Sequence, residues 1–134
     1  MNKLVCSLFA VGAAALCVSA APEPNDEARL AQALAGYQQS GPPTDCVMER
    51  ELGGNRSVGH HAIIFDAGSS YRIWVNRPAG GCANLNRGLA LVIRTPSDRF
   101  CRGDIAEVVD PVAHIPYGSC VLGDFTPYRR VSRH

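Results

Sequence analysis

The chain has 134 residues, of which 13 are basic and 12 acidic, and a formal net charge of +1. This length suits one domain and not two. The near-neutral charge excludes general binders of nucleic acids or of anionic membranes, because both classes need a strongly positive field.

Residues 1–20 predict a signal peptide. Lys3 gives a positive start, and residues 4–18 form an uncharged apolar run. Small residues then precede an expected cleavage between Ala20 and Ala21. About 15 apolar residues suit a signal peptide and fall short of the roughly 20 that a spanning helix needs. We therefore expect an exported protein, periplasmic or secreted, with no transmembrane segment and with 12 acidic and 12 basic residues after cleavage.

Residues 21–45 predict a linker with one short helix. Asn25 is a suitable N-cap, and acidic residues follow it at the first turn. An apolar stripe at helical spacing comprises Ala28, Leu30, Ala31, Ala33, Leu34 and Tyr37. Gly36 and the Ser-Gly-Pro-Pro run at 40–43 end the helix. A helix of about 11 residues is marginal alone, so it must dock or fray.

Residues 46–130 predict a β domain, followed by a C-terminal tail at 131–134. Strands at 58–66 and 70–76 are expected to form a hairpin around the turn at 67–69. In the second strand Tyr71, Ile73 and Val75 share one face, and Arg72, Trp74 and Asn76 share the other. Residues 88–94 are apolar on both faces, as in a central strand.

Further strands are expected within 100–110 and 119–125, on either side of an irregular stretch between Pro111 and Pro116. Five or six short strands at this spacing predict a mainly β fold, a small antiparallel barrel or sandwich.

Six cysteines divide between the two parts of the chain. Cys6 and Cys17 lie in the leader, and the remaining four are Cys46, Cys82, Cys101 and Cys120. Their wide spacing matches no zinc site and no thioredoxin-like motif, so we expect two structural disulfides and no metal. Four cysteines allow three pairings. Cys46 with Cys120 would tie the first strand to the last, and Cys82 with Cys101 would brace a hairpin, so this pairing is favoured.

Signals for catalysis are weak. His60 and His61 are expected on opposite faces of a strand, so they cannot both reach one ligand. The nucleophile elbow of hydrolases is lacking. Four carboxylates have no spacing that brings two of them together, namely Asp66, Asp104, Glu107 and Asp110. We assign no catalytic residue and no cofactor, and for Asp104 we expect a role in binding the backbone of a turn.

The strongest candidate for a binding surface combines arginines with aromatic rings. Its members are Arg72, Trp74, Tyr128 and Arg129. Such residues stack on ligands and make bidentate hydrogen bonds to carboxylates or phosphates. A small anionic ligand or an envelope protein would be the partner, with no nucleic acid. The competing interpretation places Trp74 in the core and leaves the terminal arginines as a solvated tail.

Several segments together carry a resemblance to a known family. They are Cys46 with the charged residues after it, residues 71–77, 80–82 and 101–104, and the ending Ser-Cys-Val-Leu-Gly-Asp-Phe-Thr-Pro-Tyr at 119–128. The set resembles small exported proteins of α-proteobacteria, of sphingomonad type, that carry a domain of unknown function. The similarity covers about residues 44–130. It implies a periplasmic, disulfide-bonded β domain and no assigned activity.

The sequence therefore favours a non-catalytic binding or envelope-associated module. One alternative is an inhibitor or immunity-type protein, which needs a rigid, protruding loop such as residues 77–81. A second is a small periplasmic hydrolase, which needs a pocket with His60 or His61 beside Asp66.

Overall fold

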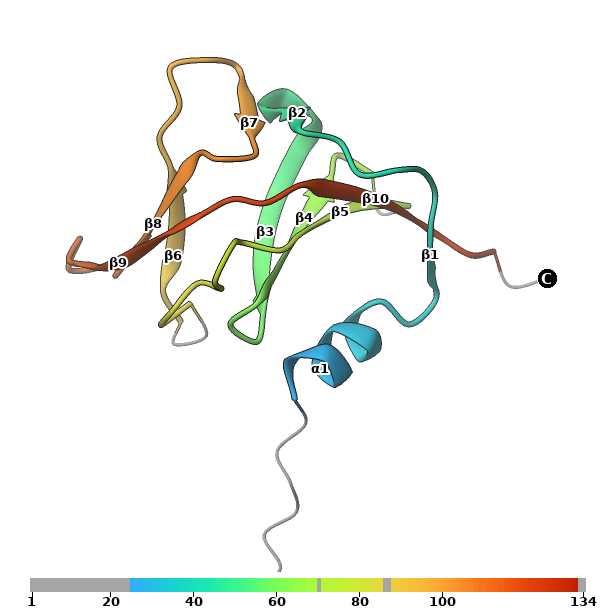
Figure 1. Ribbon diagram of the computed structural model, residues 1–134, viewed down its shortest axis with the longest axis horizontal. Helices are drawn as coiled ribbons and strands as arrows, with labels where there is room; N and C mark the ends of the chain where they lie inside the picture. The colour runs from blue at the N-terminus through green and yellow to red at the C-terminus, as the bar shows by residue number, and fades with distance from the viewer. Residues whose placement is uncertain (1–24, 70, 86–87, 133–134) are drawn as a thin grey trace, which may run out of the picture.

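The computed structural model describes residues 25–69, 71–85 and 88–132 (Figure 1). The fold is mainly β, as expected, with antiparallel sheets and one helix. The elements are α1 (Asp26–Ala33), β1 (Tyr37–Gln39), β2 (Cys46–Met48), the 3-10 turn η1 (Glu49–Glu51), β3 (Leu52–Val58), β4 (Ala62–Ala67), β5 (Arg72–Asn76), β6 (Ala90–Ile93), β7 (Arg99–Cys101), β8 (Ile105–Val109), β9 (Pro116–Val121) and β10 (Phe125–Arg130). The expected signal peptide lies outside the described residues. Among the residues described, no helix has the length and apolar character needed to cross a membrane.

The strands form three antiparallel sheets. The largest has the order β1-β10-β5-β4-β3, the second β6-β8-β9, and the third pairs β2 with β7. Strand β9 leads directly into β10, so one stretch of chain joins the two larger sheets (Figure 1). The expected hairpin exists as β4 and β5. Two expected strands are each divided, since a turn at 102–104 separates β7 from β8 and a short link at 122–124 separates β9 from β10.

The main core lies between the larger sheets. Strand β4 contributes Ile63 and Phe65, and β8 contributes Ala106 and Val108, all of them buried. The Phe65 ring also packs against Phe125, with 5.6 Å between the ring centroids. Alternate residues of β4 therefore point into this core, as the period of a strand requires.

The opposite face of the five-stranded sheet packs against α1. Leu30 is the buried residue of the helix, and it joins Ile64, Ile73 and Val75 in a second apolar cluster. The Asn25 side chain accepts a hydrogen bond from the Ala28 amide at 2.8 Å, which confirms the expected cap. The helix therefore packs against the sheet, which is one of the two outcomes expected for it.

Polar contacts fix the first turn of α1. Asp26 accepts a hydrogen bond from the His60 amide at 2.9 Å. Glu27 forms a two-point ion pair with Arg77, whose Nη2 lies 3.2 Å from Glu27 Oε2. This hydrogen bond and the charge of Arg77 lower the pKa of Glu27 below its ordinary value.

The expected apolar stripe of the helix was wrong at Tyr37, because Tyr37 begins β1 and lies opposite Arg130 of β10.

The four cysteines of the described residues form two disulfides, but the favoured pairing was wrong. The bonds join Cys46 to Cys101 and Cys82 to Cys120. Cys46 and Cys101 lie directly opposite each other because β2 pairs with β7, not with the last strand. Contacts between Ala79 and Val121 bring the loop after β5 beside the end of β9, where Cys120 lies.

The segment expected as a central strand is an edge strand. Strand β6 pairs only with β8 and is half-buried along its length. Its apolar side chains Leu91 and Ile93 still pack against the main core. Strand β3 is likewise an edge strand, at the end of the five-stranded sheet.

Removal of either disulfide is expected to lower the free energy of unfolding by a similar amount, because each bond restricts the entropy of the unfolded chain. The bonds span 55 and 38 residues, and on the chain-entropy model each contributes about 4 kcal/mol. Cys82 and Cys120 belong to the main core, so Cys82→Ala with Cys120→Ala should cost more than Cys46→Ala with Cys101→Ala. Urea unfolding of both double variants measures the difference. Peptide mapping without reduction that found Cys46 linked to Cys120 would contradict the register of β2 and β7.

Acidification is expected to release α1 before the sheets unfold. The folded-state pKa of Glu27 is lowered, so the stabilisation is complete above the ordinary pKa of 4.5 and is lost as pH falls through the lowered value. Arg77→Gln should return the Glu27 pKa towards its ordinary value and speed hydrogen exchange of the α1 amides at neutral pH. Arg50→Gln is the control, because the Arg50 side chain forms no ion pair within the described residues. Unchanged exchange in Arg77→Gln would show that the ion pair does not hold the helix.

Candidate functional site

The predicted binding residues divide between the two faces of the five-stranded sheet. Arg129 lies directly opposite Arg72, and Tyr128 lies opposite Ile73. Tyr128 therefore faces the α1 side, where it packs against the second apolar cluster. Arg72, Trp74 and Arg129 share the other face, and we call these three residues the arginine–tryptophan face.

Trp74 belongs partly to the core and partly to the surface. It is half-buried and packs against the main core. With Arg72 and Glu51, it also lines a shallow hollow of about 270 Å³. Trp74 therefore contributes to the core and also lines an open hollow, and its role in binding stays a prediction.

The two arginines of this face carry unpaired charge. Both are exposed, and within the described part of the chain neither forms an ion pair. Glu51 borders the same hollow but makes no ion pair with Arg72 there. Arg130, by contrast, lies on the opposite face and stacks over the Tyr37 ring at 5.5 Å. Two arginines at directly opposed positions of β5 and β10 therefore lack an ion-pair partner among the described residues.

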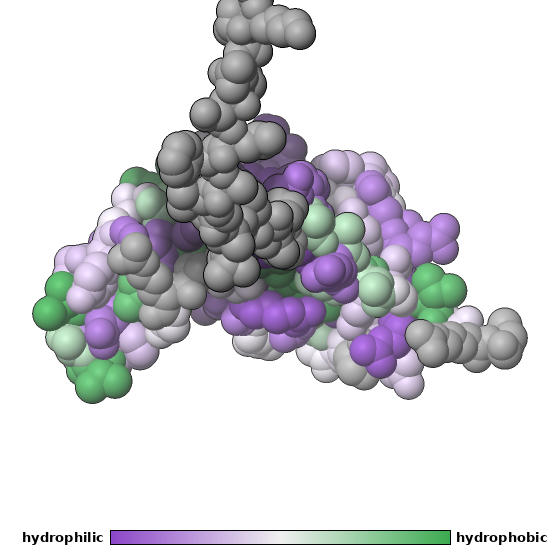
Figure 2. All heavy atoms as spheres, turned by 90° about the horizontal axis from the view of Figure 1, so that it is seen from below, coloured by the Kyte–Doolittle hydropathy of each residue, from purple (hydrophilic) through white to green (hydrophobic). Residues whose placement is uncertain are grey.

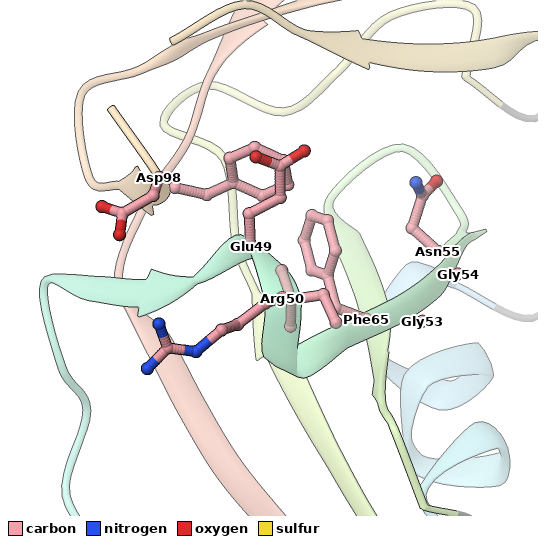
Figure 3. Close-up of a pocket in the computed structure, with 9 residues that line it drawn as sticks. Glu49, Arg50, Gly53, Gly54, Asn55, Phe65 and Asp98 are labelled. Atoms are coloured by element: carbon pink, nitrogen blue, oxygen red, sulfur yellow. The ribbon is translucent and has the colours of Figure 1, made fainter. Parts of the chain in front are cut away.

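A second concave site lies where β3 begins. Its volume is about 540 Å³, and its lining is Glu49, Arg50, Leu52, Gly53, Gly54, Asn55, Phe65, Asp98 and Phe100. We call it the β3 cleft. In Figure 3 the Phe65 ring and the Asn55 amide point to the same side as the Glu49 carboxylate, whereas the Arg50 guanidinium points away. No sequence expectation included this site. The Gly53-Gly54 pair, where the register of β3 on β4 shifts, is the signal that could have indicated it.

The expected pairing of His60 or His61 with Asp66 does not occur, and His61 lies instead 3.6 Å from Asp26. His60 and His61 lie in the turn between β3 and β4, so the expectation that they occupy a strand was wrong. Asp66 lies at the other end of β4, about 16 Å along the strand, and forms an ion pair with Arg56 at 2.7 Å. Within residues 25–69, 71–85 and 88–132, no group of His, Cys, Asp and Glu side chains could hold a metal ion.

The Arg-Gly-Asp tripeptide at 102–104 is a structural turn. Asp104 Oδ2 accepts a hydrogen bond from the Cys101 amide at 2.8 Å, as expected. Gly103 has a φ of +91°, which favours glycine. Arg102 lies 3.3 Å from Asp45 and 3.2 Å from Asp124. These internal contacts occupy both charged side chains of the tripeptide.

The loop at 77–81 is held against its neighbours. Arg77 pairs with Glu27, Pro78 is buried, and the Ala79 amide donates to the Val121 carbonyl at 3.1 Å. Arg77, Ala79 and Gly80 are nevertheless exposed, so the use of this loop as an inhibitory loop stays a prediction.

The turn between β8 and β9 extends away from the sheets at the left of Figure 1. Asp110 Oδ1 accepts hydrogen bonds from the Val112 and Ala113 amides, both at 2.8 Å. The bonds from Ala113 and Val112 lower the pKa of the Asp110 carboxyl. The Val112 side chain is 87% exposed, and Ile115 is 51% exposed. Figure 2 shows apolar side chains at the left end of the molecule, where this hairpin lies in Figure 1. A fixed turn thus presents apolar side chains to solvent.

Comparison with known proteins finds no matching family model, no matching curated protein and no matching solved structure.

Proposed function

We propose that the protein is an exported, non-catalytic binding module whose arginine–tryptophan face binds a carboxylate or phosphate group. The observation that carries the proposal is the direct opposition of Arg72 and Arg129 across β5 and β10, with no ion pair to either arginine among the described residues. Like charges at directly opposed positions destabilise a sheet. An anion between them would convert this repulsion into attraction.

Guanidinium groups suit such a ligand for geometric reasons. Each presents a planar set of donors that matches the two oxygens of a carboxylate or phosphate. Directly opposed side chains in a sheet have Cβ atoms about 4.5–5.5 Å apart, so one anion can contact both groups. Trp74 adds an aromatic surface beside Arg72, on which an apolar or planar part of the ligand can lie.

Export is part of the same proposal. The expected signal peptide and the resemblance to small exported proteins support it. The two disulfides are compatible with it, because such bonds persist in oxidising compartments. A periplasmic or secreted module of this kind would meet small anionic metabolites, or acidic groups of an envelope protein.

A specific observation favours a second candidate function. The β8–β9 turn presents Val112 and Ile115 on a backbone that Asp110 and two flanking prolines, Pro111 and Pro116, hold in one conformation. Such a pre-organised apolar projection loses little entropy on entering a pocket of another protein. The protein would then act as an inhibitor or immunity-type partner through this hairpin.

Binding of an anion is expected to change the fluorescence of Trp74, the only tryptophan of the chain. Titration with pyrophosphate or citrate should give a saturable change that weakens with added salt. Arg72→Gln and Arg129→Gln should each weaken the affinity about tenfold, which corresponds to about 1.4 kcal/mol. Glu51→Gln should strengthen it, because a negative charge leaves the hollow.

Arg50→Gln serves as the matched control for this titration, since Arg50 lies outside the arginine–tryptophan face. An affinity unchanged in the double variant Arg72→Gln with Arg129→Gln would refute the anion site. A loss of equal size in Arg50→Gln would point to a general effect of net charge.

Capture of a partner protein from periplasmic extract is expected to depend on the β8–β9 turn. Val112→Asp should abolish capture without unfolding the protein, because the side chain it replaces is 87% exposed. Val131→Asp is the control, since Val131 is 49% exposed and belongs to the C-terminal segment. Capture by Val112→Asp at the level of the unmodified protein would exclude the hairpin as the contact.

A further inference from the structure

The β3 cleft has a composition opposite to that of the arginine–tryptophan face. Glu49 and Asp98 bring carboxylates to its rim, and Phe65 and Phe100 bring aromatic rings to its interior. The cleft is formed by η1 and the start of β3 on one side and by the segment around β7 on the other. The Glu49 amide donates to the Asp98 carbonyl at 2.9 Å, so the two sides are joined by a backbone hydrogen bond.

The Glu49 carboxylate is available to a ligand. Its side chain is exposed and forms no ion pair or hydrogen bond within the described residues. The neighbouring Arg50 does not neutralise it, because the Arg50 guanidinium points away from the carboxylate (Figure 3). Asp98 has only a distant cationic neighbour, with 3.9 Å between its Oδ1 and Arg99 Nε. The cleft therefore has a negative rim.

The aromatic rings give this negative cleft a surface for cations. Phe65 and Phe100 lie 6.4 Å apart between ring centroids and are tilted by 55°. Phe65 is buried and forms the floor, whereas Phe100 is half-buried and forms a wall. The face of an aromatic ring attracts cations through its quadrupole, and the attraction increases where water is partly excluded.

A second hollow adjoins the cleft and extends the space available to a ligand. Its volume is about 510 Å³, and Glu49 and Phe100 line both spaces. The additional lining residues are Ile93, Arg94, Thr95 and Pro96. Arg94 lies 3.3 Å from Glu107 in an ion pair, so part of its charge is compensated. An elongated ligand could thus occupy both hollows, with its charged group at the residues they share.

We propose that the β3 cleft binds a guanidinium or alkylammonium group, with the cation between the Glu49 carboxylate and the Phe100 ring. This site is separate from the anion site of the proposed function. The cation would gain an ion pair from Glu49 and a ring contact from Phe100, while the carbon chain attached to it would lie along the adjoining hollow. The ligand class is therefore an arginine or lysine side chain in a peptide, or a free alkylamine.

The test is an amide NMR titration of the disulfide-bonded protein. The probes are N-acetylarginine methylamide, its lysine counterpart and agmatine, and the neutral isostere is N-acetylcitrulline methylamide. We expect saturable shifts of the Gly53, Gly54 and Phe100 amides with the cationic probes and none with citrulline. Tighter binding of the two amino acid derivatives than of agmatine would identify a peptide side chain as the source, and the reverse order a free amine.

Variants separate this site from nonspecific attraction. Glu49→Gln should weaken binding at least tenfold, and Phe100→Leu severalfold, whereas Arg50→Gln should strengthen it. Glu51→Gln is the matched control, because Glu51 is also exposed and unpaired within the described residues but does not line the cleft. It should leave the affinity unchanged.

Three results would overturn the inference: no saturable shift at millimolar probe, equal binding of the citrulline isostere, or equal losses in Glu49→Gln and Glu51→Gln. A variant whose remaining amide spectrum is unchanged is folded, so a loss of binding in it reports on the site. Trp74 fluorescence should not respond to the cationic probes. The failure of this site and the failure of the anion site can therefore be distinguished.

Discussion

Strand β4 must bury both of its faces, and the rest of the structure depends on this constraint. Ile63 and Phe65 point into the main core, while Ile64 between them points towards α1 and is fully buried. A strand that is apolar on both sides needs a layer on each side. The second sheet supplies one layer and the docked helix supplies the other.

This two-sided burial explains why disulfides, helix caps and ion pairs lie around the sandwich. A chain of this size buries a limited area of apolar surface on folding, so disulfides and helix caps make a large relative contribution to its stability. The Cys82–Cys120 bond fixes the loop after β5 against β9, and the Cys46–Cys101 bond joins the two short strands that close one end. The ion pair of Glu27 with Arg77 joins the helical layer to the loop after β5.

Sites for ligands arise where the layers stop. The arginine–tryptophan face lies where β5 and β10 extend beyond the main core, so Arg72 and Arg129 reach solvent while Trp74 still touches apolar side chains. The β3 cleft lies where β3 begins at the edge of the five-stranded sheet, and the Glu49 carboxylate is at its rim. The two proposed sites differ in charge, and we propose a chemically different ligand for each.

The sequence by itself determined the local features, namely the Asn25 cap, the β4–β5 hairpin and the alternation of Ile73 with Trp74. It also determined that the four cysteines after residue 45 form disulfides. These depend on neighbours within a few residues, or on residue type. Only the tertiary structure decided which cysteines pair, which face Tyr128 occupies and that Glu49 and Phe100 line the same cleft. These contacts join segments tens of residues apart, and strand order, which no local pattern encodes, brings them together.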